Sequence, residues 1–178
     1  GVVLAGAAGG GVWRTDDDGA TWRPLTDGLP DLSVGAVAWA PSDPDIVYVG
    51  TGEAGFAVDF IPGIGLLRSD DGGETWLLPD EVVASQFYAL SVDPRDPDSL
   101  VAATNDGLFT TEDGGVNWHL RLASSDLMGV TEVLRSPADP DRLWTAVWCT
   151  SRCPEGIDRV MRSDDGGVTW TSAGAGLA

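Results

Sequence analysis

Two segments of the chain gather side chains that can bind or transform a ligand. Their members are Glu53, Phe56, Asp59 and Phe60 in residues 53–63, and Arg152, Glu155 and Asp158 in residues 149–158. Two facing carboxylates can act as acid and base at a glycosidic bond, and phenylalanine rings can stack on a sugar or a partner. Which of these groups meet depends on the elements that position them.

The second segment also holds the two cysteines of the chain, Cys149 and Cys153. Two thiols cannot complete a structural zinc site, and the single histidine, His119, lies 30 residues before the first of them. The spacing is not that of a Cys-x-x-Cys redox site. We expect a local disulfide in an oxidising compartment, with two free structural thiols as the alternative, and no metal or cofactor.

One phrase of eight residues occurs four times, with tryptophans 54, 42 and 52 residues apart. Its recurring positions are Thr15, Asp17, Gly19 and Trp22; Ser69, Asp71, Gly73 and Trp76; Thr111, Asp113, Gly115 and Trp118; and Ser163, Asp165, Gly167 and Trp170. Glycine accepts positive φ, and Ser, Thr and Asp side chains can satisfy the amides of a turn. The phrase therefore predicts a hairpin, repeated about every 49 residues.

A second phrase, Asp-Pro-Asp, lies between the first ones at 43–45, 96–98 and 139–141, with a short apolar run on each side. We expect it to close a hairpin between the first two strands, a and b, of a four-stranded unit. The strand before each eight-residue phrase, strand c, has adjacent apolar residues, such as Leu66 and Leu67. Neighbouring residues of a strand point to opposite faces, so both faces of each sheet must be covered.

Repeated sheets covered on both faces predict an all-β propeller with about four blades, near residues 1–30, 31–80, 81–125 and 126–178. The count is 15 strands, because the first blade lacks strand a. We interpret the chain as part of a larger propeller, and a four-bladed form, self-contained or completed by an oligomer, is the alternative. The start at Gly1 without Met fits either a removed leader or an excised piece.

The eight-residue phrase resembles the Asp-box, or bacterial neuraminidase repeat, Ser/Thr-x-Asp-x-Gly-x-Thr-Trp. Copies one, two and four match it well, whereas copy three has Asn117 where Thr is usual. Together with the Asp-Pro-Asp turns, the whole chain is similar to the xyloglucanase and sortilin-type propellers and, more loosely, to photosystem-assembly-factor propellers. The resemblance implies a propeller in which the box is structural and lies away from the active face.

In such a propeller the a–b and c–d turns form one face, here called the turn face, and the b–c and d–a loops form the other, the loop face. The candidate ligand residues on the loop face are Glu53, Phe56, Asp59, Phe60, Asp106, Trp148, Arg152, Glu155 and Asp158. The phenylalanines can instead tuck beneath their own loop. Box tryptophans in a fixed register indicate packing, and so do Trp13 and Trp144.

No catalytic constellation is evident on this loop face. A sialidase needs clustered arginines and a tyrosine nucleophile, but the candidate arginines, Arg14, Arg68 and Arg162, fall in different blades. Of the two tyrosines, Tyr48 falls in a core strand and Tyr88 at the start of strand a. A two-carboxylate glycosidase needs a pair that the sequence does not identify. We therefore expect no catalytic residue and a binding or scaffolding module, extracytoplasmic and able to serve as a subunit of a periplasmic membrane complex. A xyloglucanase-like glycoside hydrolase acting through loop-face carboxylates is the alternative.

The charge balance limits the classes of molecule that we expect this chain to bind. Acids outnumber bases 28 to 10, for a formal charge of −18, so nucleic acid is excluded as a default partner. No stretch approaches the roughly 20 apolar residues of a membrane helix, so this segment is not expected to insert. Seventeen of the 28 acids fall in the two turn phrases. The loop face is thus much less acidic than the total, which leaves a protein or a polysaccharide as the expected partner.

Overall fold

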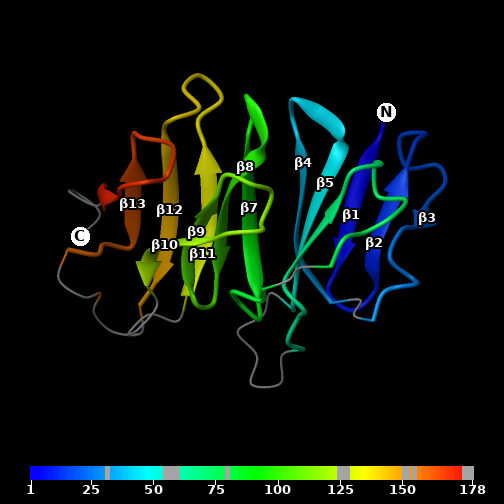
Figure 1. The fold of residues 1–178 in the computed structure, drawn as a ribbon, viewed down its shortest axis with the longest axis horizontal. Helices are drawn as coiled ribbons and strands as arrows, with labels where there is room; N and C mark the ends of the chain where they lie inside the picture. Colours follow the sequence, from blue (N-terminus) through cyan, green and yellow to red (C-terminus); the bar gives the residue numbers. More distant parts are fainter. Residues whose placement is uncertain are drawn as a thin grey trace.

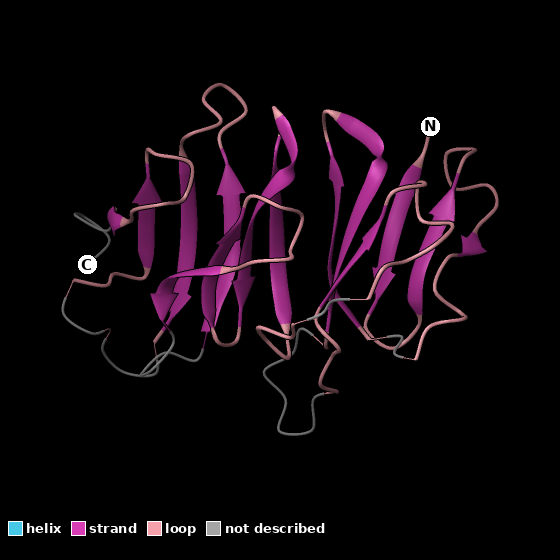
Figure 2. Cartoon of the chain, viewed as in Figure 1, coloured by secondary structure: helices cyan, strands magenta, loops and turns pink. Residues whose placement is uncertain are grey.

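A computed structural model describes residues 1–30, 33–53, 61–78, 81–123, 129–149, 153 and 156–173. Within these ranges the chain consists of strands, turns and loops, without a helix (Figure 2). Phe56, Asp59, Phe60, Arg152 and Glu155 lie outside the described residues.

Fourteen strands form four antiparallel sheets. The first sheet holds β1 (Val3–Ala7), β2 (Gly11–Thr15) and β3 (Arg23–Pro24), and the second holds β4 (Val34–Ala40), β5 (Asp43–Thr51) and β6 (Leu66–Ser69). The third holds β7 (Phe87–Asp93), β8 (Asp96–Thr104), β9 (Gly107–Thr111) and β10 (His119–Ala123). The fourth holds β11 (Gly129–Arg135), β12 (Leu143–Trp148), β13 (Val160–Ser163) and β14 (Thr171–Ser172).

The sheets stand side by side in chain order, with the first and the fourth at opposite ends of the row (Figure 1). β4 lies between β1 and β7, and β7 also contacts β11, so the first strands of the sheets line one edge of the stack. The β4–β5 and β7–β8 hairpins are at the top of the view, and the β1–β2 and β8–β9 connections are at the bottom (Figure 1). The two faces expected from the repeat are therefore separated in space.

The all-β propeller arrangement is confirmed, including a first sheet that lacks one strand, but two local expectations were wrong. The second sheet has three strands, and its expected fourth is reduced to a single bridge between Arg68 and Leu77. The Asp-Pro-Asp phrases at 43–45 and 96–98 do not form the turns. They begin β5 and β8, because the turn is completed earlier by Pro41-Ser42 and by Pro94-Arg95, and a register shift follows each turn.

Burial follows the position of each sheet in the row. In β6, both Leu66 and Leu67 are buried, as expected for a sheet covered on both faces. At the ends of the row one face is open, so Val12 is buried while its neighbour Trp13 is 36% exposed. Trp13 is therefore exposed within the described residues, because no described sheet covers its side of the first sheet. Trp144 is likewise only partly buried, on the outward side of the fourth sheet.

All four eight-residue phrases fold into hairpins with one hydrogen-bond pattern, seen in the second copy. Ser69 Oγ donates to Asp71 Oδ1 (2.8 Å) and accepts from the backbone N of Gly73 (2.8 Å). Asp71 also accepts from the backbone N (2.8 Å) and the hydroxyl (2.6 Å) of Thr75. In each hairpin, one aspartate carboxylate thus binds both the Ser or Thr at the start of the phrase and the Thr or Asn near its end.

The third hairpin keeps this pattern despite its different residue. Asn117 Nδ2 donates to Asp113 Oδ2 at 2.7 Å, in place of the threonine hydroxyl. Asn is therefore a geometric equivalent of Thr at this position.

These hydrogen bonds predict a stability that falls in acid. Bonds from Thr21, Thr75 and Asn117 lower the pKa of Asp17, Asp71 and Asp113, respectively, from 3.8 to about 2. A lowered pKa in the folded state stabilises the fold above the unfolded pKa, and that contribution is lost as the pH falls toward 2. We expect the Tm to drop steeply between pH 4 and pH 2.

Calorimetry across that pH window tests the expectation. Asp113→Asn should show a shallower pH dependence than the wild type. Glu112→Gln removes an adjacent exposed carboxylate and leaves the hydrogen bonds of Asp113 in place, so it is the matched control. Equal slopes in both variants would contradict the assignment.

Candidate functional site on the loop face

In the second, third and fourth sheets, the first strand carries one extra residue at its loop-face end. The ladder of each strand pair shifts by one residue between Val34 and Ala36, between Phe87 and Ala89, and between Val130 and Glu132. The inserted residues are Gly35, Tyr88 and Thr131. A β-bulge redirects a side chain and is frequent beside functional sites. Of the three bulges, the one in β7 presents an aromatic ring with a hydroxyl.

Gln86 joins this bulge to the loops on both sides of it. Its side chain is 5% exposed, and Nε2 donates to the backbone oxygen of Glu53 at 2.8 Å. Its backbone N donates to Asn105 Oδ1 at 2.9 Å, and its Oε1 accepts from the Tyr88 hydroxyl at 3.2 Å. Gln86 therefore connects the b–c connection of the second sheet with the Tyr88 ring through its side-chain amide, and it reaches the b–c connection of the third sheet through its backbone N–H.

The carboxylate of Asp106 also acts on Tyr88, through its charge. Burial raises the pKa of Tyr88, and the negative charge of Asp106 raises it further. Tyr88 is half-buried and Asp106 is exposed, so the ring stays a neutral phenol beside a carboxylate that solvent can reach. We call Glu53, Gln86, Tyr88, Asn105 and Asp106 the loop-face cluster. It offers a ring, a phenol and acceptor oxygens, which are the groups that bind sugar hydroxyls and faces.

Gly129 of β11 lies against the ring of this cluster. A Cβ at Gly129 would lie 3.1 Å from Tyr88 Cε2 and 3.1 Å from Asn105 Cα. Its ladder partner is Trp148, which is 40% exposed. The close approach of the Gly129 backbone places the fourth sheet at the edge of the cluster.

The expected site residues are thus only partly brought together. Glu53 and Asp106 lie in the cluster, and Trp148 lies one strand beyond it. Asp158 lies in the connection that precedes β13 of the fourth sheet, and its carboxylate accepts a hydrogen bond from the Ser172 hydroxyl of β14. Phe56, Asp59, Phe60, Arg152 and Glu155 are not among the described residues.

Sequence reasoning missed Gln86 and Asn105 and treated Tyr88 only as the start of a strand. A signal was present in the repeats. The second sheet has Ser33-Val34-Gly35 at the start of its first strand, and the corresponding residues of the third sheet are Gln86-Phe87-Tyr88. Two large polar side chains at positions that are small elsewhere mark a departure from the repeated scaffold.

The two cysteines form a disulfide, Cys149–Cys153, with Cα atoms 5.2 Å apart. Cys149 is 2% exposed and belongs to the core of the third and fourth sheets, with Cys153 and Ile157 packed against it. The bond therefore ties the end of β12 and its following loop to the core.

Removing this disulfide is expected to destabilise the fold. For a loop this short, loss of the cross-link costs about 2 kcal/mol, which lowers the Tm by about 4–8 °C. The measurement is the Tm of Cys149→Ser/Cys153→Ser against the wild type, with and without reductant. The wild type with reductant should match the variant, and an unchanged Tm in both would contradict the expectation.

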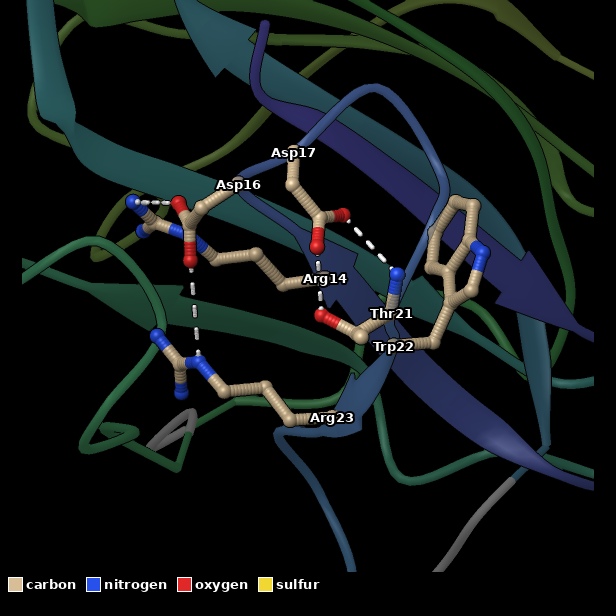
Figure 3. Close-up of a pocket in the computed structure, with 6 residues that line it drawn as sticks. All are labelled: Arg14, Asp16, Asp17, Thr21, Trp22 and Arg23. Atoms are coloured by element: carbon tan, nitrogen blue, oxygen red, sulfur yellow. Dashed lines mark hydrogen bonds and ion pairs between the residues drawn. The ribbon is translucent and has the colours of Figure 1, made fainter.

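The turn face has its own hollow, of about 180 Å³, lined by Arg14, Asp16, Asp17, Thr21, Trp22 and Arg23 (Figure 3). Its guanidinium groups are engaged in ion pairs: Arg14 bonds Asp16 at 2.9 Å, and Arg23 bonds Glu74 at 2.5 Å. The charged side chains that line this hollow therefore serve to close the first hairpin and to form an ion pair with the hairpin of the second repeat.

Metal and membrane features were also sought within the described ranges. There, no group of three or more His, Cys, Asp or Glu side chains is arranged to hold a metal ion. No helix in that part of the chain is long and apolar enough to cross a bilayer.

No family model matches the chain. Among solved structures, the GH74 xyloglucanase from Xanthomonas campestris superposes with a TM-score of 0.77 at 22% identity, over 99% of this chain and 29% of that one. The GH74 enzyme of Niastella koreensis gives 0.72 at 26% identity, over 96% and 27%. The chain has the propeller fold of GH74 xyloglucanases. YCF48 bound to a D1 peptide gives 0.52 at 18% identity, over 95% and 63%.

Curated relatives agree with the structures. Xyloglucanase Xgh74A of Acetivibrio thermocellus is 30% identical over 95% of this chain, and a xyloglucanase of Paenibacillus sp is 29% identical over 92%. The chain spans 24% and 19% of their lengths, respectively. The similarity to xyloglucanases thus covers nearly all of this chain and a minor part of each relative.

Proposed function

We propose that this chain is a glycan-contacting part of a xyloglucanase-like propeller, and that its loop face binds a β-glucan such as xyloglucan. The observation that carries the proposal is the Tyr88 bulge, held by Gln86 between Glu53 and Asn105 and set beside Asp106. Tyr88 supplies a ring for a sugar face. Glu53 and Asp106 supply the carboxylates that we propose to face the sugar hydroxyls or the glycosidic oxygen.

The relatives favour this function over a purely scaffolding module. The sequence alone favoured scaffolding, with the hydrolase as the alternative. The similarity to two xyloglucanases over more than nine-tenths of the chain supports the alternative. The peptide-bound neighbour shares the fold alone at 18% identity, so it adds no argument for a protein partner.

Two finer assignments accompany the proposal. We assign the four hairpins as Asp-boxes with a structural role, which their shared carboxylate bonds support. We also assign an extracytoplasmic location, since a disulfide persists in an oxidising compartment.

Affinity electrophoresis in gels containing xyloglucan tests the function. The wild type should be retarded, and Tyr88→Ala should bind about tenfold more weakly, the loss expected for an aromatic anchor. Tyr88→Phe keeps the ring and should retain most of the affinity. Asp106→Asn tests whether the Asp106 carboxylate contributes to the affinity for xyloglucan.

Glu112→Gln, an exposed substitution on the turn face, is the matched control and should bind like the wild type. The proposal is wrong if the wild type is not retarded by xyloglucan. It is equally wrong if the control loses as much affinity as Tyr88→Ala.

A further inference from the structure

The arginine ion pairs of this chain are concentrated on the turn face. Within the described ranges, seven arginines pair with acids of the c–d hairpins or of the a–b turns: Arg14, Arg23, Arg68, Arg95, Arg135, Arg142 and Arg162. Much of the negative charge of the turn face is therefore compensated locally. On the loop face, none of the described arginines forms an ion pair with Asp106 of the loop-face cluster.

The Asp106 carboxylate is exposed, and among the described residues it has no hydrogen-bond or ion-pair partner, although the backbone beside it is fixed. The backbone N of Asp106 donates to Thr104 Oγ1 at 3.2 Å, and that hydroxyl donates to the backbone oxygen of Gly107 at 2.8 Å. Asn105 exchanges two hydrogen bonds with Gln86, through its backbone N (3.1 Å) and its Oδ1 (2.9 Å). The chain therefore presents this negative charge from a well-held turn of the loop face.

Tyr88 places an aromatic ring within electrostatic range of that carboxylate. The residue is half-buried, and its hydroxyl donates to Gln86 Oε1 at 3.2 Å. Burial, and then the charge of Asp106, raise the pKa of the phenol, so the ring is uncharged. A neutral ring attracts a cation through its negative face, and a carboxylate attracts it by charge and by hydrogen bonds. Together these two groups suit a protonated amine.

A sugar chain that carries amino groups satisfies this site better than a neutral chain does. β-1,4-linked glucosamine has the backbone of a β-1,4-glucan, with an ammonium group in place of the hydroxyl at C2 of each unit. A hydroxyl offers the Asp106 carboxylate a hydrogen bond from a neutral donor, whereas an ammonium offers one between two charged groups, which is stronger. A uronic acid chain would instead bring a like charge to the carboxylate.

We propose that the loop-face cluster binds amino-sugar chains in preference to neutral glucan, and that Asp106 is the residue that determines this preference. The proposal rests on the proposed function for the choice of the sugar backbone, and it adds a cationic class of ligand at the same surface. The cluster belongs to the second and third sheets, and the third sheet has a neighbour on each side, since β7 contacts both β4 and β11.

Isothermal titration calorimetry with cellohexaose and with the β-1,4-linked glucosamine hexamer tests the proposal, in mildly acidic buffer at physiological ionic strength. The wild type should bind the glucosamine hexamer about fivefold more tightly, which is the gain expected from one exposed ion pair and one cation–π contact. Asp106→Asn should lose most of this preference.

Glu112→Gln is the matched control, because it removes one exposed negative charge from the turn face and so changes the net charge of the chain by the same amount. It should keep the wild-type ratio of the two dissociation constants. Circular dichroism of both variants confirms that they are folded.

Each outcome of the titrations is decisive. Equal dissociation constants for the two hexamers in the wild type would overturn the proposal and leave the proposed glucan binding intact. A preference that survives in Asp106→Asn, or that Glu112→Gln loses to the same extent, overturns it as well. If the glucosamine hexamer binds through Asp106 and cellohexaose does not bind, the amino-sugar site stands and the glucan function fails. If neither hexamer binds, this proposal is wrong, and electrophoresis in xyloglucan gels still decides the proposed function.

Discussion

Phe87→Ala is expected to lower the free energy of unfolding by about 3–5 kcal/mol, the range for removing a buried phenylalanine from a close-packed core. Phe87 is fully buried in the cluster that joins the second and third blades. Gly50 of β5 lies so close that a Cβ there would be 2.3 Å from Phe87 Cβ. The backbone has closed in around this ring, so little relaxation can refill the space that alanine leaves.

Urea unfolding followed by tryptophan fluorescence measures this change. Leu120→Ala, at a side chain 52% exposed, is the control and should change stability by less than about 0.5 kcal/mol. A loss below about 1 kcal/mol for Phe87→Ala would contradict the view that this ring holds the two blades together.

Gly52→Ala is the second large effect, and it acts on the candidate site. Gly52 has φ +92°, where a side chain is strained, and a Cβ would lie 2.1 Å from the backbone oxygen of Ser85. We expect a loss of stability of about 1–3 kcal/mol from the backbone alone. Because Gly52 precedes Glu53 and Ser85 precedes Gln86, the shift that relieves the clash should also separate those two residues and weaken xyloglucan binding.

The control for this variant is Gly9→Ala, because no atom lies within 4 Å of a Cβ at Gly9. It should leave both stability and binding near the wild type. Retained xyloglucan affinity in a destabilised Gly52→Ala would show that the Glu53–Gln86 link does not position the glycan site.

The propeller architecture was predictable from the sequence because its determinants are local. Each hairpin is closed by a Ser or Thr, an Asp and a glycine within one short phrase, and the structure repeats those bonds four times. Adjacent apolar residues in strand c, as at Leu66 and Leu67, correctly indicated sheets covered on both sides.

The candidate site was predictable only in part, because it depends on register and on contacts between blades. Glu53 and Asp106 could be placed on the loop face by their position between strands b and c. The bulge at Tyr88 has no marker within its own strand, and the bonds of Gln86 reach residues 33 and 19 positions away. The exposure of Trp13 was unpredictable for the same reason, because its burial depends on a neighbouring blade rather than on its own strand.

Hydrogen exchange of the wild-type chain with and without xyloglucan tests the central claim most directly. If the loop face binds the glycan, amides around 86–88 and 105–106 should exchange more slowly in its presence, and the hairpin amides around 71–75 and 113–117 should not change. Protection confined to the hairpins of the turn face, or no protection at saturating xyloglucan, would contradict the account.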